Sequence, residues 1–169
     1  EFARYVFGSY TGVSVGPWNK LIRTQMLRDN RLYFPELRIS EDVPFSFLLF
    51  SRAQKVVCLP DITYHYIIHE GTICQYNPRD VIPVDEIKWH IKSRMMLKDI
   101  ASQCKDEDFF PLMVSAAMGY CFSLAGVIVR KKKIISERIP YEVLSQLIAY
   151  PIQWSELKKH PDVFKKNKW

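Results

Sequence analysis

Two adjacent carboxylates, Glu41 and Asp42, are the residues of this 169-residue chain that first suggest chemistry. They immediately precede the mostly apolar run 43–50, so the sequence predicts a helix that begins at the acidic pair and enters a packed interior. Negative charge at a helix N-terminus stabilises the helix by ~0.3–1 kcal/mol. Helix stability can therefore explain one of the two carboxylates. It does not explain the segments that bracket them, which are Trp18-Asn19-Lys20 upstream and residues 64–72 downstream.

The elements that position the pair are predicted from turn residues and apolar spacing. Residues 18–27 have apolar side chains at the spacing of a short amphipathic helix. Ser40 has the identity and position of an N-cap for the next helix, which is expected to end near residues 53–54. Residues 55–59 and 62–68 are short apolar runs, and each is predicted to form a strand.

The character of the chain changes after residue 77, beyond which only helices are predicted. They are expected to start near residues 80–85 and to continue at 109–129, 140–149 and 154–164. The predicted fold class is therefore α+β. We expect a first part of short strands and helices, residues 1–77, and a mainly helical C-terminal subdomain, residues 78–169.

The uncharged run at residues 109–129 has two interpretations. A membrane span needs ~20 residues, and acidic residues before the run with basic residues after it suit an inserted helix with a cytoplasmic basic end. Against this, Ser115, Gly119 and Ser123 recur every four residues, and small residues at that spacing let another helix approach closely in water or in lipid. We favour a buried helix of a helical subdomain or dimer interface, with a membrane helix as the alternative.

The basic excess of the chain is moderate, with a formal net charge of +6. It is concentrated in residues 130–133 and in the lysines of the last dozen residues. Such runs are usually solvated, but they also suit a patch for anionic lipid or for a phosphate-bearing substrate. Nucleic acid is not favoured as a partner, because no nucleic-acid-binding motif accompanies the charge.

The cysteines indicate the compartment. Cys58, Cys74, Cys104 and Cys121 show no Cys-x-x-Cys spacing, and no secretory signal precedes them. A reducing, cytoplasmic compartment fits best. The chain begins at Glu1 without a methionine, so we expect it to be a piece of a longer protein.

Five short segments follow one another in an order found in a known enzyme family. They are Pro17-Trp18-Asn19-Lys20-Leu21, Phe34-Pro35, Glu41-Asp42-Val43, Leu59-Pro60 and residues 64–72. Together they resemble the C-terminal half of a family-2 glycosyltransferase catalytic domain of GT-A fold, over residues 8–76. Such enzymes build bacterial capsular, exopolysaccharide and cell-wall glycans. The resemblance implies transfer of a sugar, with inversion, from a nucleoside-diphosphate sugar to a glycan or lipid-linked acceptor.

The resemblance implies that Asp42 is the general base. It would take the proton of the acceptor hydroxyl as that oxygen attacks the anomeric carbon of the donor. Glu41 would orient the acceptor or the loop. Placement at a helix N-terminus would hold the Asp42 carboxylate in place and favour its ionised form. The alternative is an acidic pair that begins a helix and has no catalytic role.

The resemblance also implies a divalent metal, Mn²⁺ or Mg²⁺, that bridges the donor phosphates. His69 matches the histidine ligand of many GT-A enzymes, and imidazole suits Mn²⁺ better than Mg²⁺. His65 competes for this role, because strand alternation would put both histidines on one face. Trp18 and Lys20 match a segment beneath the acceptor site, where a tryptophan can stack on a sugar and a lysine can meet a phosphate. A core tryptophan and a surface lysine are the alternative.

The chain departs from the family pattern in three respects. Ile67 stands where an arginine is common, and Thr72 where a serine is common. Nothing before Trp18 resembles the donor-binding βαβ half or its Asp-x-Asp motif, and the Asp-x-Asp at residues 106–108 is better explained as a helix cap. We therefore expect this fragment by itself to be inactive and to hold no metal.

The sequence thus predicts part of a glycosyltransferase that works in the cytoplasm, at the inner face of the cell membrane, with peripheral membrane contact through its basic segments. The alternative function is a non-catalytic helical module for protein interaction or membrane docking. Apolar surface left by the missing half predicts a homo-oligomer.

Overall fold

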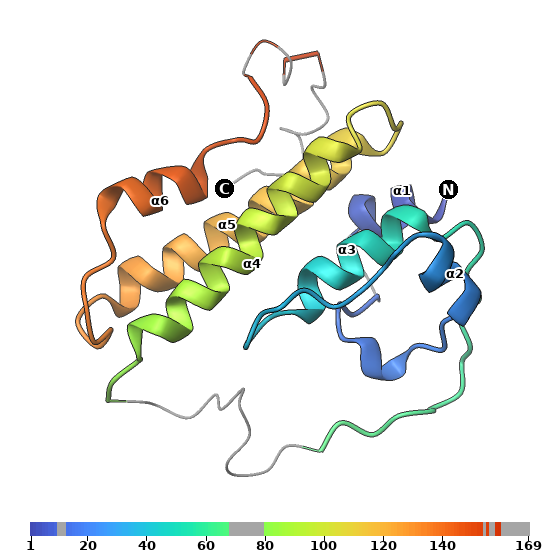
Figure 1. Cartoon of the computed structure of the whole chain (residues 1–169), viewed down its shortest axis with the longest axis horizontal. Helices are drawn as coiled ribbons and strands as arrows, with labels where there is room; N and C mark the ends of the chain where they lie inside the picture. The colour runs from blue at the N-terminus through green and yellow to red at the C-terminus, as the bar shows by residue number, and fades with distance from the viewer. Residues whose placement is uncertain (10–12, 68–79, 154, 156–157, 160–169) are drawn as a thin grey trace.

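A computed structural model describes residues 1–9, 13–67, 80–153, 155 and 158–159 of the chain (Figure 1). Within these ranges the secondary structure consists of helices. They are α1 (Phe2–Ser9), the 3-10 helix η1 (Pro17–Asn19), α2 (Thr24–Asp29), α3 (Asp42–Arg52), α4 (Val84–Gln103), α5 (Phe110–Lys131) and α6 (Tyr141–Ile148).

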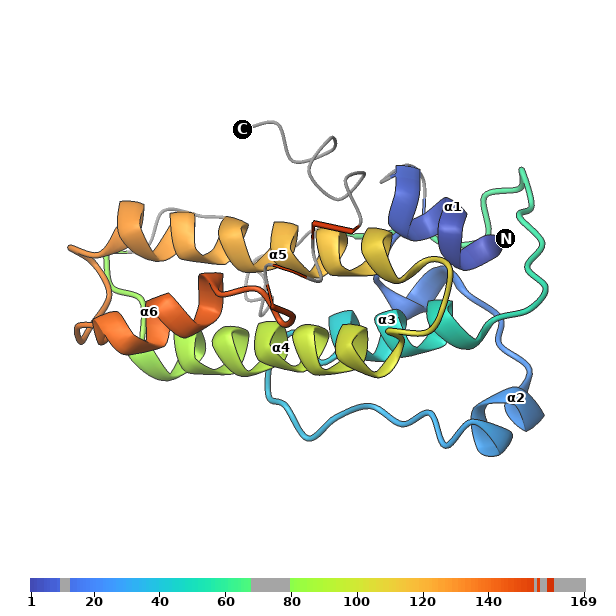
Figure 2. The ribbon, with the colours of Figure 1, turned by 90° about the horizontal axis from the view of Figure 1, so that it is seen from above.

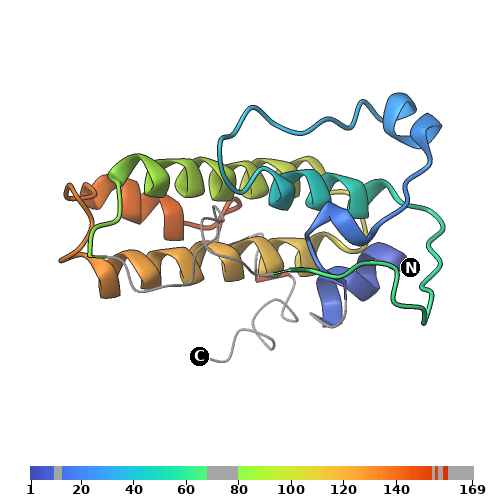
Figure 3. The ribbon, with the colours of Figure 1, turned by 90° about the horizontal axis from the view of Figure 1, so that it is seen from below.

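The two longest helices, α4 and α5, form the centre of the molecule. They run side by side in opposite directions, because only residues 104–109 connect them (Figure 2). Helix α6 packs against both at one end of the pair. At the other end α3 packs on α4, and α1 packs on α5 and on α3. Figure 3 shows the same two groups of helices from below.

The core follows the apolar face of α5. Met113, Val114, Ala117, Met118 and Cys121 of this helix are fully buried. By length and composition alone, α5 is also apolar enough to cross a membrane, and half of its most apolar window is buried inside the protein. Both interpretations of residues 109–129 therefore agree with a long apolar helix at this position.

Aromatic side chains connect α1 and α3 to the start of α5. The Phe7 ring of α1 lies 5.1 Å from the Phe47 ring of α3 and 6.1 Å from the Phe109 ring, measured between centroids. On the opposite side of α3, Phe45 stacks on Phe34 at 4.0 Å. These contacts bury the apolar run that follows the acidic pair, as the sequence predicted.

The predicted α+β fold class is wrong, because the described residues are mainly helical and contain no strand. Residues 55–59 and 62–67, which were expected to form strands, are exposed and have no regular secondary structure (Figures 1 and 3). A strand requires a neighbouring strand to pair its N–H and C=O groups. The described residues offer only an isolated bridge between Ile82 and Ile135, so the apolar runs remain unpaired. A half GT-A sheet is therefore not part of this fold.

Other predictions agree better with the structure. The helices predicted to start near residues 80–85 and to span 109–129 and 140–149 correspond to α4, α5 and α6. The single helix expected at 18–27 is instead two short ones, η1 and α2. The helix predicted at 154–164 lies mostly outside the described residues. The boundary between residues 77 and 78 stays a prediction.

The α4–α5 contact can be tested with a matched pair of substitutions. Leu97 of α4 is fully buried, whereas Leu21 is fully exposed. We expect Leu97→Ala to lower the free energy of unfolding by ~2–5 kcal/mol, because it leaves a cavity in the core. Leu21→Ala should change it by less than about 0.5 kcal/mol. Urea denaturation followed by circular dichroism measures both, and equal effects would contradict the described core.

Candidate functional site

The acidic pair lies at the start of α3, where it meets α4. Asp42 is the first residue of the helix, and Glu41 occupies the N-cap position without a side-chain cap hydrogen bond. Ser40, predicted to be the N-cap, is not. Its backbone is in the left-handed region (φ 61°), which few residues other than glycine adopt, so the turn must be held by other contacts.

Two hydrogen bonds from α4 hold this turn. The Ser40 Oγ lies 2.9 Å from Nδ1 of His90, and the Ser93 Oγ donates to the backbone carbonyl of Ser40 at 2.8 Å. Ser93 is itself fully buried. The residue before the acidic pair is therefore fixed to a central helix of the fold, which defines where the Asp42 carboxylate can lie.

Burial raises the pKa of Asp42. This half-buried carboxyl has its pKa raised above the usual value, first by loss of solvent and then by the adjacent charge of Glu41. A hydrogen bond from the Val43 backbone and the positive charge of Arg94 act in the opposite direction but are weaker. The helix terminus was expected to favour the ionised form. Desolvation outweighs that effect.

Arg94 of α4 is the cation that acts electrostatically on Asp42. Its guanidinium lies 5.2 Å from the centroid of the Tyr120 ring of α5, and its Nη1 donates to the Ser93 Oγ at 3.1 Å. Its Nε is buried and has no hydrogen-bond partner among the described residues. Burial lowers the pKa of Arg94, and burial together with the Arg94 charge lowers the pKa of His90. Sequence reasoning missed both residues, because nothing in their local pattern marks them.

A second group of side chains is an exposed aromatic cluster. The Trp18 ring lies 6.3 Å from the Tyr64 ring and 5.5 Å from the Tyr66 ring, between centroids. All three side chains are about half exposed. A Cβ at Gly16 would overlap the Trp18 ring, so the glycine is required for the position of the indole. The sequence analysis singled out Trp18 but not its contact with Tyr64 and Tyr66, because that contact joins segments more than forty residues apart.

Lys20 is half-buried, and its ammonium is hydrogen-bonded within its own loop. Its Nζ donates to the carbonyls of Ser14 and Gly16, each at 2.6 Å, and to Oδ1 of Asn19 at 2.8 Å. An ammonium has three donors, so all of them are used within its own loop. Burial lowers the pKa of Lys20. This lysine holds the η1 loop, and the predicted phosphate contact would require those bonds to break.

The structure separates the predicted residues into two places. The Lys20 Nζ lies 5.9 Å from the centroid of Phe50, which is eight residues after Asp42 on α3. With a rise of 1.5 Å per residue, that is roughly 12 Å along the helix. The carboxylates therefore lie at the start of α3, and Trp18 and Lys20 belong to a loop near its other end.

The metal prediction falls largely outside the described residues. His69 lies outside them, and the competing His65 is exposed. Within the ranges that the structure describes, no group of three or more His, Cys, Asp or Glu side chains could hold a metal ion. Those residues do not fit a metal site, and we assign no reaction step to a metal.

Comparisons with protein-family models, with curated proteins and with solved structures found no match for the chain. The resemblance to family-2 glycosyltransferases therefore rests only on the residues and motifs quoted for it. Asp42 and the aromatic cluster have to be judged on their own geometry and chemistry.

The charges around Asp42 predict that two substitutions shift its pKa in opposite directions. We expect its carboxyl to titrate above the usual aspartate value. Arg94→Gln should raise this pKa further, because a positive charge that favours the carboxylate is lost. Glu41→Gln should lower it, because a like charge is removed. NMR of ¹³C-labelled aspartate carboxyls measures all three values.

The same shift links stability to pH. Because folding raises the pKa of Asp42, its stabilising contribution is fully present below the unfolded pKa and is lost as pH rises through the folded pKa. Asp42→Asn should remove that part of the pH dependence, whereas Asp61→Asn, at an exposed position, is the matched control. If both variants kept the wild-type dependence, the described burial of Asp42 would be wrong.

Proposed function

We propose that the chain is the acceptor-side part of an inverting glycosyltransferase, with Asp42 as its general base. The observation that carries this proposal is the setting of Asp42. It is a half-buried carboxyl with a raised pKa, at the first residue of a helix whose preceding turn is bonded to a central helix. The raised pKa of this carboxylate is closer to neutral pH, and a general base is most effective when its pKa lies near the pH at which the enzyme works.

The reaction follows from the position of that base. Asp42 accepts the proton of an acceptor hydroxyl while the hydroxyl oxygen forms a bond to the anomeric carbon of a nucleoside-diphosphate sugar. The bond from that carbon to the diphosphate oxygen breaks, and the nucleoside diphosphate leaves with the bonding electrons. Attack from the face opposite the leaving group inverts the anomeric configuration. Glu41, next to the base, orients the acceptor or the loop.

The aromatic cluster of Trp18, Tyr64 and Tyr66 supports the acceptor side of this proposal. Flat aromatic faces that remain half exposed can stack on the apolar face of a sugar ring. Because the cluster lies toward the far end of α3 from Asp42, it would bind acceptor sugars remote from the reacting hydroxyl. Lys20 would serve this site by fixing the η1 loop that carries Trp18.

The donor sugar nucleotide would be bound by a separate part of the intact enzyme. In this proposal Asp42 and the aromatic cluster act on the acceptor and do not bind the donor. We propose that the intact enzyme works in the cytoplasm, at the inner face of the cell membrane, on a glycan or lipid-linked acceptor.

Saccharide binding tests the aromatic cluster without requiring turnover. We expect an oligosaccharide panel, titrated by NMR, to contain at least one ligand that shifts the Trp18 resonance. Trp18→Ala should abolish that binding. Gly16→Ala should weaken it several-fold, because the new Cβ displaces the indole.

Matched controls keep this result specific. Trp89→Ala removes a tryptophan of α4, and Gly126→Ala adds a Cβ whose nearest neighbour is the flexible end of Arg130. Neither should change the affinity. If both tryptophan variants lose binding equally, the cluster is not the saccharide site.

Turnover tests Asp42. In a protein that joins this chain to its donor-binding half, Asp42→Asn should lower kcat by about 10²–10⁴-fold, because the amide cannot accept the proton. Glu41→Gln should act mainly on KM for the acceptor. Steady-state kinetics distinguishes the two, and an Asp42→Asn variant with wild-type kcat would place the base elsewhere.

The second candidate function is a non-catalytic interaction module. The observation that favours it is the exposed apolar surface of residues 56–67, where Val57, Leu59, Ile62 and Ile67 are each more than half exposed. Large exposed apolar patches usually mark interaction sites. Absence of saccharide binding together with absence of turnover in the joined wild-type protein would favour this alternative.

A further inference from the structure

A groove lies between the C-terminal end of α5 and the start of α6. Its volume is about 450 Å³, within the usual range of ligand pockets. Its lining includes the apolar side chains of Ile128, Ile135, Ile139 and Leu144. The first three are buried, so the floor of the groove belongs to the core of the protein.

The rim of the groove is basic. Lys132 and Arg138 line it, with Glu137 as the one carboxylate in the lining. Arg130, Lys131 and Lys133, next to Lys132 in the sequence, are also exposed. Over residues 128–144 the sequence has five basic and two acidic residues, which gives a formal charge of +3. An anionic group would therefore be attracted to the mouth of an apolar hollow.

Exposed apolar side chains continue this surface along α6. Tyr141 is 73% exposed and Ile148 is 43% exposed. They are seven residues apart and thus lie on the same face of the helix. Val129, at the end of α5, is 56% exposed and also lines the groove. Basic and exposed apolar residues side by side are the composition of a surface that lies in a membrane interface.

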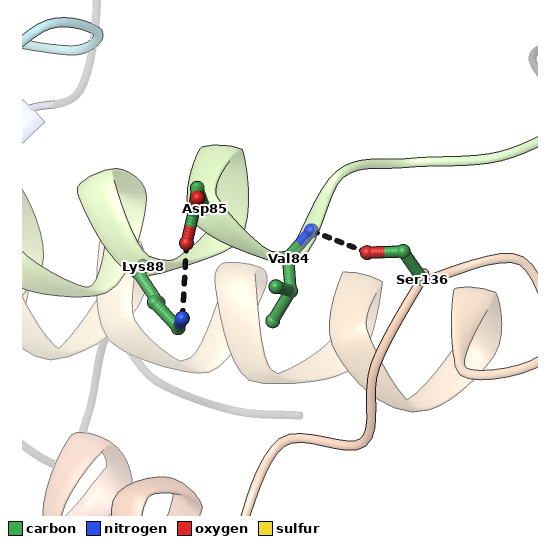
Figure 4. Close-up of polar contacts among 4 residues, drawn as sticks. All are labelled: Val84, Asp85, Lys88 and Ser136. Atoms are coloured by element: carbon green, nitrogen blue, oxygen red, sulfur yellow. Dashed lines mark hydrogen bonds and ion pairs between the residues drawn. The ribbon is translucent and has the colours of Figure 1, made fainter.

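The groove is held in shape by contacts to α4. The Ser136 Oγ accepts a hydrogen bond from the backbone N–H of Val84 at 2.8 Å, at the start of α4 (Figure 4). At the other end of α6, the Lys98 Nζ donates to the carbonyl of Gln146 at 2.5 Å. Leu147 is fully buried. The groove is therefore anchored at both ends before any ligand binds.

We propose that this groove binds an anionic phospholipid at a bilayer surface. The lipid phosphate contacts Lys132 and Arg138, and the glycerol and first acyl carbons lie against the apolar floor. Tyr141 and Ile148 enter the interface beside it. A free phosphate would contact only the basic rim. A membrane lipid would also contact the apolar floor and the exposed face of α6, so the groove fits a membrane better. This inference does not depend on the proposed glycosyl transfer.

Vesicle co-sedimentation tests the charged rim. The intact chain should sediment with vesicles of phosphatidylcholine and phosphatidylglycerol and not with phosphatidylcholine alone. Lys132→Gln combined with Arg138→Gln should weaken binding roughly 30-fold, from ~1 kcal/mol for each basic residue near the surface. Arg23→Gln combined with Arg28→Gln removes the same charge around α2, at the opposite end of the molecule (Figure 1). An equal loss in both pairs would overturn the site.

A separate substitution tests the apolar contact with the bilayer. Tyr141→Ser should weaken binding to the anionic vesicles several-fold, while binding of inorganic phosphate stays unchanged. If Tyr141→Ser has no effect on vesicle binding and phosphate competes fully, the groove is a phosphate site and the lipid proposal fails.

Alkaline carbonate should release the wild-type chain from vesicles. A chain that resists this extraction is inserted through α5, which also overturns peripheral docking.

Discussion

Helix α5 has to be covered along most of its length, and the way it is covered determines the rest of the structure. Its apolar side chains would otherwise be exposed to water at a cost of about 25 cal/mol per Å². Helix α4 covers one side in an antiparallel contact that buries Leu97 and Ala101 completely. Helices α1 and α6 cover what remains at the two ends. The other features of the protein are placed by this central pair.

The candidate catalytic carboxyl depends on α4 in the same way. The helix packs against α5 through its apolar residues and uses His90 and Ser93 to hold the turn before Asp42. Arg94, the residue after Ser93, contacts the Tyr120 ring of α5 and acts electrostatically on Asp42. A single turn of α4 therefore connects the core to the acidic pair. Substitutions in that turn are expected to alter both the stability of the fold and the setting of the carboxyl.

The two ends of the molecule differ in chemistry. One end has the aromatic cluster and the exposed apolar residues 56–67, and the acidic pair lies between the ends, where Ser40 is bonded to His90 and Ser93 of α4. The other has a basic rim around an apolar groove, built by α5 and α6. If the first end binds a lipid-linked acceptor and the second contacts the bilayer, the two proposed roles would act on the same membrane. Each role stands on different residues and can be tested without the other.

The sequence by itself determined the helices and the acidic pair. Apolar spacing of 3–4 residues predicted α4, α5 and α6, because that pattern is local and reports directly which face of a helix is buried. It also placed Glu41 and Asp42 at the start of α3. These properties depend on neighbours within a few residues of each other. They do not require knowledge of what lies across the core.

Only the tertiary structure decided the features that depend on distant partners. The strands predicted at 55–59 and 62–68 are absent from the described residues 55–67, because strand formation requires another segment to pair with, which local pattern does not supply. Ser40 looked like a cap by position, but His90 and Ser93, some fifty residues away, bind it instead. The pKa of Asp42 is raised because packing removes its solvent, against the expectation from the helix terminus. The groove between α5 and α6 is likewise formed by segments that only the tertiary structure brings together, with Ser136 and Gln146 each bonded to α4.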